Sequence, residues 1–72
     1  MREEYHELRR LLAGYLHHIA RQSEASCLQI MFTLKTADQV FVMLDYLDKH
    51  KNESFDEGYL LDLAIAIAEQ VQ

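Results

Sequence analysis

The stretch CLQIMFTLKTADQVFVMLDYL, residues 27–47, constrains the fold of this chain more than any other feature. Placed on a helix at about 100° per residue, its apolar side chains point in nearly every direction. The chain has only 72 residues, and a domain of this size buries only about 60 % of the surface that its unfolded form exposes. We therefore expect one domain, residues 1–72, with a small core and more apolar surface than one copy can bury.

Residues that form turns are scarce in this chain. It contains no Pro and only 2 Gly, and 50 % of its residues are hydrophobic. This composition disfavours disorder, which requires low hydrophobicity, and a turn-rich all-β fold, which uses Gly, Pro and Asn at its corners. We predict an all-α fold, a small compact bundle or orthogonal array of four short helices. The predicted helices cover residues of about 2–22, 24–34, 37–50 and 55–70.

Helical periodicity is clearest in the first segment. Its apolar residues gather on one predicted face: Tyr5, Leu8, Leu11, Leu12, Tyr15, Leu16 and Ile19. Gly14 interrupts this helix at a cost of about 1 kcal/mol relative to Ala, or else allows another backbone to approach closely. Capping signals mark the starts of the later helices: Ser23 or Ser26 for the second, a Thr36–Gln39 capping box for the third and a Ser54–Glu57 capping box for the fourth.

The second segment fits two kinds of secondary structure. Leu28, Ile30, Phe32 and Leu34 occupy alternate positions, as in a β-strand. A lone strand would leave its backbone N–H and C=O groups unpaired, and the chain offers no second strand candidate. We therefore favour a helix for residues 24–34 and keep the strand as the alternative.

The third and fourth predicted helices present more than one apolar face. The third has a core face (Val40, Phe41, Met43, Leu44 and Leu47) and further apolar residues on its other side. Either the central helices are well wrapped by their neighbours, or part of this surface packs on another protein. For the second case the predicted contact surface is Met31, Phe32, Val42, Tyr46, Leu61 and Ile65. The predicted function is a protein–protein interaction module, that is, a homodimer, a subunit or a regulatory adaptor. Its predicted partner is a second copy of the chain or a small helical protein.

Charge is distributed unevenly along the chain, which has a net charge of −5. The first predicted helix has a basic face made of Arg2, His6, Arg9, Arg10, His17 and Arg21. An acidic cluster follows near the predicted turn between the third and fourth helices: Asp45, Asp48, Glu53, Asp56, Glu57 and Asp62. An acidic chain repels phosphate, so nucleic acid is a disfavoured partner. The alternative functions are a nucleic-acid-associated regulator that uses the basic face, and an acidic inhibitor of a nucleic-acid-binding protein.

The sequence contains no pattern that predicts catalysis, a metal or another cofactor. Glycine-rich phosphate loops, zinc motifs and nucleophile elbows are absent, and we predict that the protein is not an enzyme. His17 and His18 are adjacent, so on a helix their side chains diverge. Cys27 lies in an apolar run, where a buried and unreactive thiol is expected.

Cysteine content and hydropathy suggest a location. Cys27 is the only cysteine, so an internal disulfide is excluded. Residues 1–22 carry too many charges for a signal peptide, and no run approaches the roughly 20 apolar residues that a membrane span needs. We expect a cytoplasmic protein without a membrane segment.

Overall fold

The computed structural model describes the backbone of residues 2–56 and 58–72 and, among these, the side chains from Glu4 onward. These residues form four α-helices and one π-helical turn and contain no strand. The elements are α1 (Arg2–Gly14), the π-helical turn η1 (Tyr15–Ile19), α2 (Glu24–Thr33), α3 (Ala37–Lys49) and α4 (Tyr59–Gln70). The prediction of a small all-α bundle is confirmed, and the segment that also fitted a strand is a helix.

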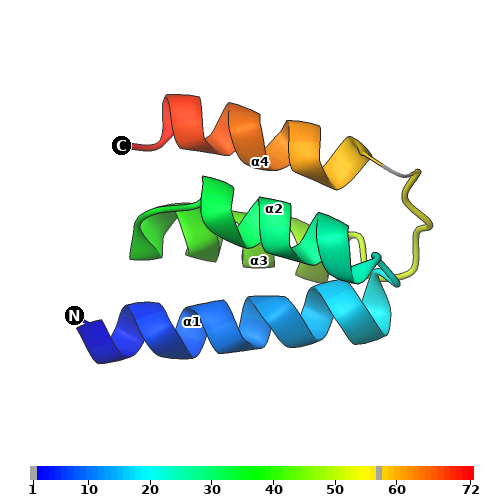
Figure 1. The fold of residues 1–72 in the computed structure, drawn as a ribbon, viewed down its shortest axis with the longest axis horizontal. Helices are drawn as coiled ribbons and strands as arrows, with labels where there is room; N and C mark the ends of the chain where they lie inside the picture. The colour runs from blue at the N-terminus through cyan, green and yellow to red at the C-terminus, as the bar shows by residue number, and fades with distance from the viewer. Residues whose placement is uncertain (1, 57) are drawn as a thin grey trace.

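The helices form a bundle in which consecutive helices run in opposite directions (Figure 1). In this view α4 lies above and α1 below, with α2 in front of α3 between them. The closest pairs are α1 with α3 and α2 with α4, each running in parallel. α2 and α3 lie on opposite sides of the bundle, one facing the viewer and the other behind it (Figure 1).

The core is built from regularly spaced residues of all the helices. Val40, Met43 and Leu47 follow the spacing of one face of α3, and equivalent spacing in α4 buries Leu60 and Ala64. The full set of buried apolar residues is Leu12, Leu16, Cys27, Ile30, Leu34, Val40, Met43, Leu47, Leu60, Ala64 and Ile67. Burying a Leu or Val side chain completely contributes about 1.5–3 kcal/mol, so these residues supply most of the driving force for folding.

The predicted caps of α2 and α3 are present. Ser23 is the N-cap of α2, and its Oγ accepts a hydrogen bond from the backbone N–H of Ser26 at 3.1 Å. At α3, Thr36 Oγ1 accepts from the N–H of Gln39 at 3.2 Å, and Gln39 Oε1 accepts from the N–H of Thr36 at 3.3 Å. This reciprocal pair is the predicted capping box, and it fixes the start of α3.

Gln39 also joins α3 to the end of α4. The residue is only 5 % exposed. Nε2 donates to the carbonyl oxygens of Val71 at 2.6 Å and Ala68 at 3.4 Å, while Oε1 accepts from the N–H of Lys35 at 2.6 Å. A buried amide is tolerated only when its polar atoms are paired, and here they are paired with two segments of backbone, one before α3 and one at the end of α4.

The predicted start of the fourth helix is wrong. α4 begins at Tyr59 rather than at about residue 55, after Gly58, whose φ of 90° lies in the left-handed region that favours glycine. Ser54 lies in the loop, and Glu57 lies outside the described residues. Phe55 instead packs against the core. Tertiary burial of this ring therefore outweighs the local capping signal.

The first helix ends at Ile19, not at about residue 22 as predicted. Its last turn is π-helical, and the N–H of Ala20 donates to the carbonyl oxygen of Tyr15 at 2.9 Å. Arg21 then adopts a φ of 57° and ends the helix. A π-turn contains more residues than an α-turn, so Ile19 rotates away from the apolar face and is exposed, contrary to prediction.

Candidate functional site

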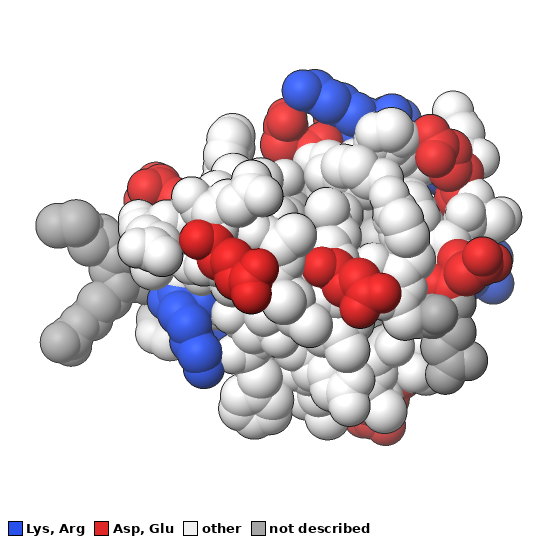
Figure 2. Space-filling model, turned by 90° about the horizontal axis from the view of Figure 1, so that it is seen from above, with Lys and Arg blue, Asp and Glu red and all other residues white. Residues whose placement is uncertain are grey.

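Large apolar side chains are exposed on every helix. They are Leu11, Ile19, Leu28, Phe32, Phe41, Val42, Tyr59 and Ile65. Figure 2 looks onto the α4 side, where uncharged residues cover most of the face and the charged side chains stand in separate groups. Single exposed apolar residues are normal on protein surfaces, whereas contiguous ones indicate a contact site.

The clearest apolar concavity is a groove between α1 and α3. It is lined by Leu8, Leu11, Tyr15, Phe41, Leu44, Asp45 and Asp48, and its volume is about 300 Å³. We call it the α1/α3 groove. Leu11 is 60 % exposed and Phe41 58 % exposed, although both were predicted to face the core. They lie on the flanks of their helices because Leu12, Val40 and Met43 already occupy the central positions.

One edge of the α1/α3 groove is polar. Tyr15 Oη donates to Asp48 Oδ1 at 3.0 Å and so connects η1 with α3. This hydrogen bond raises the pKa of Tyr15, with smaller contributions from desolvation and from the negative charge of Asp48. Asp45 Oδ2 lies 3.0 Å from Lys49 Nζ. Because both of these side chains are exposed, their ion pair contributes little to stability.

The six residues of the predicted contact surface do not form one patch. Met31, Tyr46 and Leu61 are half-buried against the core, whereas Phe32, Val42 and Ile65 are exposed. Phe32 belongs to α2 and Val42 to α3, and these helices lie on opposite sides of the bundle (Figure 1). Sequence periodicity identified apolar residues beyond the core but not which neighbour covers each of them.

The predicted basic face is interrupted by Arg9. Its Nη1 donates to the carbonyl oxygen of Met31 at 2.8 Å and to Tyr5 Oη at 3.0 Å, and its guanidinium lies 5.3 Å from the centre of the Tyr5 ring. Tyr5 Oη donates in turn to the carbonyl oxygen of Leu34 at 3.2 Å. Arg9 therefore caps the C-terminal end of α2. The other described members, His6, Arg10, His17 and Arg21, are exposed, and the side chain of Arg2 lies outside the description.

The predicted acidic cluster divides between two concavities. Asp45 and Asp48 line the α1/α3 groove. Glu53 and Asp56 line a second pocket, at the opposite flank of α3. Asp62 is exposed on α4, and Glu57 lies outside the described residues. The acidic residues are therefore better described by the two concavities that they border than as one surface.

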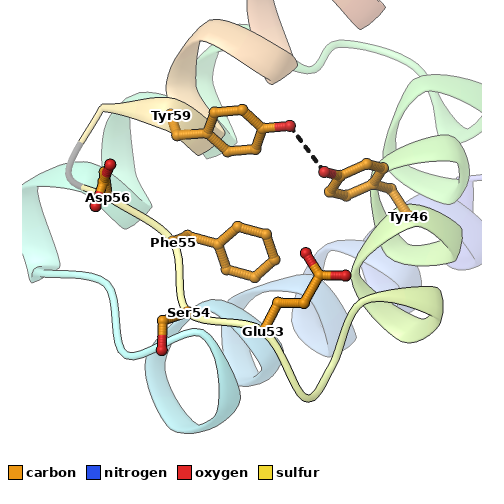
Figure 3. A pocket seen from close by; sticks show the side chains of 6 residues that line it. All are labelled: Tyr46, Glu53, Ser54, Phe55, Asp56 and Tyr59. Carbon is orange, nitrogen blue, oxygen red and sulfur yellow. Dashed lines mark hydrogen bonds between the residues drawn. The ribbon is translucent and has the colours of Figure 1, made fainter.

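The second pocket lies where the loop after α3 meets the start of α4 (Figure 3). It is lined by Tyr46, Glu53, Ser54, Phe55, Asp56 and Tyr59, has a volume of about 180 Å³, and is called here the aromatic pocket. Tyr46 Oη and Tyr59 Oη share a hydrogen bond of 2.8 Å. The rings of Phe55 and Tyr59 are nearly parallel, with centroids 5.9 Å apart and an interplanar angle of 12°. No local pattern in the sequence predicts this pocket, because the conformation of the loop brings its lining residues together.

Tyr46 is held in place from two sides. The His50 ring stacks on it at a centroid distance of 4.2 Å, and His50 Nδ1 lies 2.5 Å from Glu53 Oε2. The hydrogen bond to Tyr59 raises the pKa of Tyr46 to about 12, with further contributions from desolvation and from the charges of Tyr59 and Glu53. Tyr46 is therefore a neutral phenol at neutral pH.

The remaining candidates for chemistry are accounted for by the fold. Cys27 is buried, its Sγ lies 3.9 Å from the carbonyl oxygen of Gln22, and burial raises the pKa of its thiol. A raised pKa disfavours the reactive thiolate. Among the described residues, no group of three or more His, Cys, Asp or Glu side chains is placed to hold a metal ion. None of the helices in the described ranges has the length and apolarity required to cross a membrane.

Comparison of the chain with models of protein families, with curated proteins and with solved structures gave no match. The α1/α3 groove and the aromatic pocket are therefore interpreted from their own geometry.

Proposed function

We propose that this chain is a protein–protein interaction module that forms a homodimer through the α1/α3 groove. The observation that carries the proposal is the pair of exposed side chains, Leu11 and Phe41, on the two sides of one apolar concavity. A module of this kind binds rather than catalyses. We place it in the cytoplasm, a reducing compartment in which its only cysteine stays a free thiol.

A second copy is the occupant that best fits the groove. In a two-fold dimer the same patch serves both subunits, so the exposed apolar side chains of one copy meet those of the other. Both carboxylates that line the groove, Asp45 and Asp48, lie on its α3 side, and each has a partner, Lys49 for Asp45 and the Tyr15 hydroxyl for Asp48.

The size of the patch sets the expected affinity. Covering the exposed parts of Leu11 and Phe41 contributes roughly 1–2 kcal/mol per side chain, or about 4–8 kcal/mol for the four in a dimer. Association costs about 4–15 kcal/mol in lost motion, so the half-buried residues of the groove must contribute as well. A standard interface takes about 800 Å² from each partner, roughly a sixth of the 5090 Å² surface of this chain. We expect a dimer that dissociates on dilution to micromolar concentration.

Light scattering coupled to size-exclusion chromatography over a dilution series tests the proposal. The wild-type protein should approach twice the 8.5 kDa of one chain as concentration rises. Phe41→Asp places a charge in the groove without touching the core and should give a monomer at every concentration. Phe32→Asp is the matched control, because Phe32 is 69 % exposed on α2, outside the groove.

Two outcomes would reject the proposal. One is a wild-type protein that stays monomeric at the highest concentration reached. The other is a dimer that Phe41→Asp leaves intact, particularly if Phe32→Asp dissociates it, since self-association would then use the outer face of α2. Circular dichroism of each variant shows whether a change of mass reflects the interface or a loss of folding.

A further inference from the structure

The aromatic pocket combines two features that attract organic cations. Tyr46, Phe55 and Tyr59 surround it with three aromatic rings, and the faces of such rings carry negative electrostatic potential. Figure 3 shows the Glu53 carboxylate directed toward the rings of Phe55 and Tyr46, while the Asp56 carboxylate lies at the outer edge. A positive group in this pocket would therefore contact ring faces and a carboxylate together.

Internal contacts hold this arrangement before any ligand binds. The hydrogen bond between Tyr46 Oη and Tyr59 Oη joins α3 to α4. His50 stacks on Tyr46 and pairs with Glu53, so one side chain positions both a ring and the carboxylate. Because Tyr46 remains a neutral phenol, its ring does not add a second negative charge that would have to be desolvated. A preorganised pocket loses less entropy on binding than a mobile one.

One contact between a cation and an aromatic ring already exists elsewhere in the molecule. The guanidinium of Arg9 lies over the ring of Tyr5. Within the described residues, no Lys or Arg side chain lies over the rings of Tyr46, Phe55 or Tyr59. His50 covers one face of the Tyr46 ring and pairs with Glu53 Oε2. A cation from outside the chain would therefore use the rings of Phe55 and Tyr59 and the second oxygen of the Glu53 carboxylate.

We propose that the aromatic pocket binds the head group of an organic cation, an alkylammonium or a guanidinium. Its volume of about 180 Å³ lies below the roughly 300–1,000 Å³ of pockets that enclose drug-sized ligands, so the pocket takes a head group rather than a whole cofactor. Cation–π contacts form when the positive group lies within about 6 Å of a ring centroid, and three rings bordering one small space satisfy that distance. The site is distinct from the α1/α3 groove and does not depend on dimerisation.

The head group has two possible sources, a free quaternary ammonium compound or the side chain of an arginine in a protein. Titration with choline and with a blocked arginine, followed by NMR of the aromatic ring protons, separates them. We expect saturable shifts of the Phe55 and Tyr59 resonances, with a roughly millimolar dissociation constant for the isolated head group. Binding of either cation supports the proposal and identifies the source.

Two variants and one neutral probe make the test specific. Phe55→Leu keeps an apolar side chain but removes a ring face, and Glu53→Gln removes the charge from an exposed residue; each should weaken binding by at least about five-fold. Phe32→Leu removes an exposed ring from α2 and should leave binding unchanged. The neutral tert-butyl analogue of choline should not bind.

The proposal is overturned if the neutral analogue binds as well as choline, because the pocket would then be merely apolar. It is also overturned if neither cation shifts the ring resonances, or if Glu53→Gln and Phe55→Leu bind as the wild type does. The amide spectrum of each variant reports whether it is folded, and Glu53→Gln keeps the test valid if Phe55→Leu unfolds.

Discussion

The side-chain amide of Gln39 donates a hydrogen bond of 2.6 Å from Nε2 to the carbonyl oxygen of Val71, which joins the first turn of α3 to the last turn of α4. The two residues are 32 positions apart in the chain. The other end of the amide accepts from the N–H groups of Lys35 and Thr36. One buried side chain thus links the α2–α3 connection, the α3 cap and the end of α4.

Replacing Gln39 should destabilise the protein more than any single capping substitution. Gln39→Leu leaves two N–H groups and two carbonyl groups without their partner, and we expect the free energy of unfolding to fall by about 2–4 kcal/mol. Denaturant unfolding measures the change. Gln29→Leu, at an exposed position of α2, is the matched control and should change stability by no more than about 0.5 kcal/mol.

Gln39→Glu should make stability depend on pH. A carboxylate at this position would face the carbonyl oxygens of Ala68 and Val71 at the negative end of α4, so its pKa should be raised. The protonated acid can donate a hydrogen bond, whereas the carboxylate cannot. The variant should therefore lose stability as pH rises through that pKa. A variant equally stable at acidic and neutral pH would contradict this role.

Arg9 and Arg10 are neighbours in the sequence, but the same substitution should destabilise the protein much more at Arg9 than at Arg10. Arg9→Ala removes the two hydrogen bonds to Met31 and Tyr5, and we expect a loss of about 1.5–3 kcal/mol in the free energy of unfolding. Arg10 is exposed, so Arg10→Ala should cost no more than about 0.5 kcal/mol. Equal effects in thermal unfolding would show that Arg9 does not cap α2.

The two glycines should give changes of opposite sign when each becomes alanine. Gly14 has helical angles, φ −61° and ψ −43°, and a Cβ there would meet nothing within 4 Å. The alternative that Gly14 admits a second backbone is therefore wrong, and Gly14→Ala should stabilise the protein by about 0.5–1 kcal/mol. At Gly58 a Cβ also has open space, but φ is +90°. Gly58→Ala should therefore destabilise the protein by about 1–2 kcal/mol, through backbone strain alone. Thermal unfolding of both variants measures the two changes in stability, and changes of the same sign would contradict the prediction.

Alkaline pH should weaken the fold through Tyr46. Its pKa is about 12 in the folded protein against an ordinary value of 10.0, so the protonated phenol is favoured by folding. This stabilisation is fully present below about pH 10 and is lost as pH rises from about 10 to 12. Tyr59→Phe removes the hydrogen bond to Tyr46 and should move its titration toward the ordinary value. Tyrosinate absorbance follows the titration, and an unchanged curve in Tyr59→Phe would exclude the hydrogen bond as the main cause.

Local signals predicted the helices well where the determining residues are close in sequence. The capping box of Thr36 and Gln39 lies within four residues, and α3 starts where it indicates. The start of α4 was missed because Gly58 and the burial of Phe55 determine it. The end of α1 was missed because a π-turn leaves no simple periodic pattern in the sequence.

The candidate surfaces were harder to predict than the helices. A helical wheel places Leu11 and Phe41 near the core residues of their helices, but their exposure depends on where α1 and α3 meet. The aromatic pocket depends even more on tertiary structure, since Phe55 and Tyr59 approach Tyr46 only through the loop conformation. The spacing of apolar residues predicts which face of a helix is apolar. It does not predict which other helix packs against each side of that face.

The hydrogen bonds of Arg9 and Gln39 hold the C-terminal ends of α2 and α4, which lie at the same end of the bundle (Figure 1). The aromatic pocket lies at the other end, beside the α3–α4 loop. These hydrogen bonds and the aromatic pocket thus lie at opposite ends of the bundle. Substitutions in loop residues 51–56 can therefore alter the lining of the aromatic pocket without removing the hydrogen bonds that hold the ends of α2 and α4.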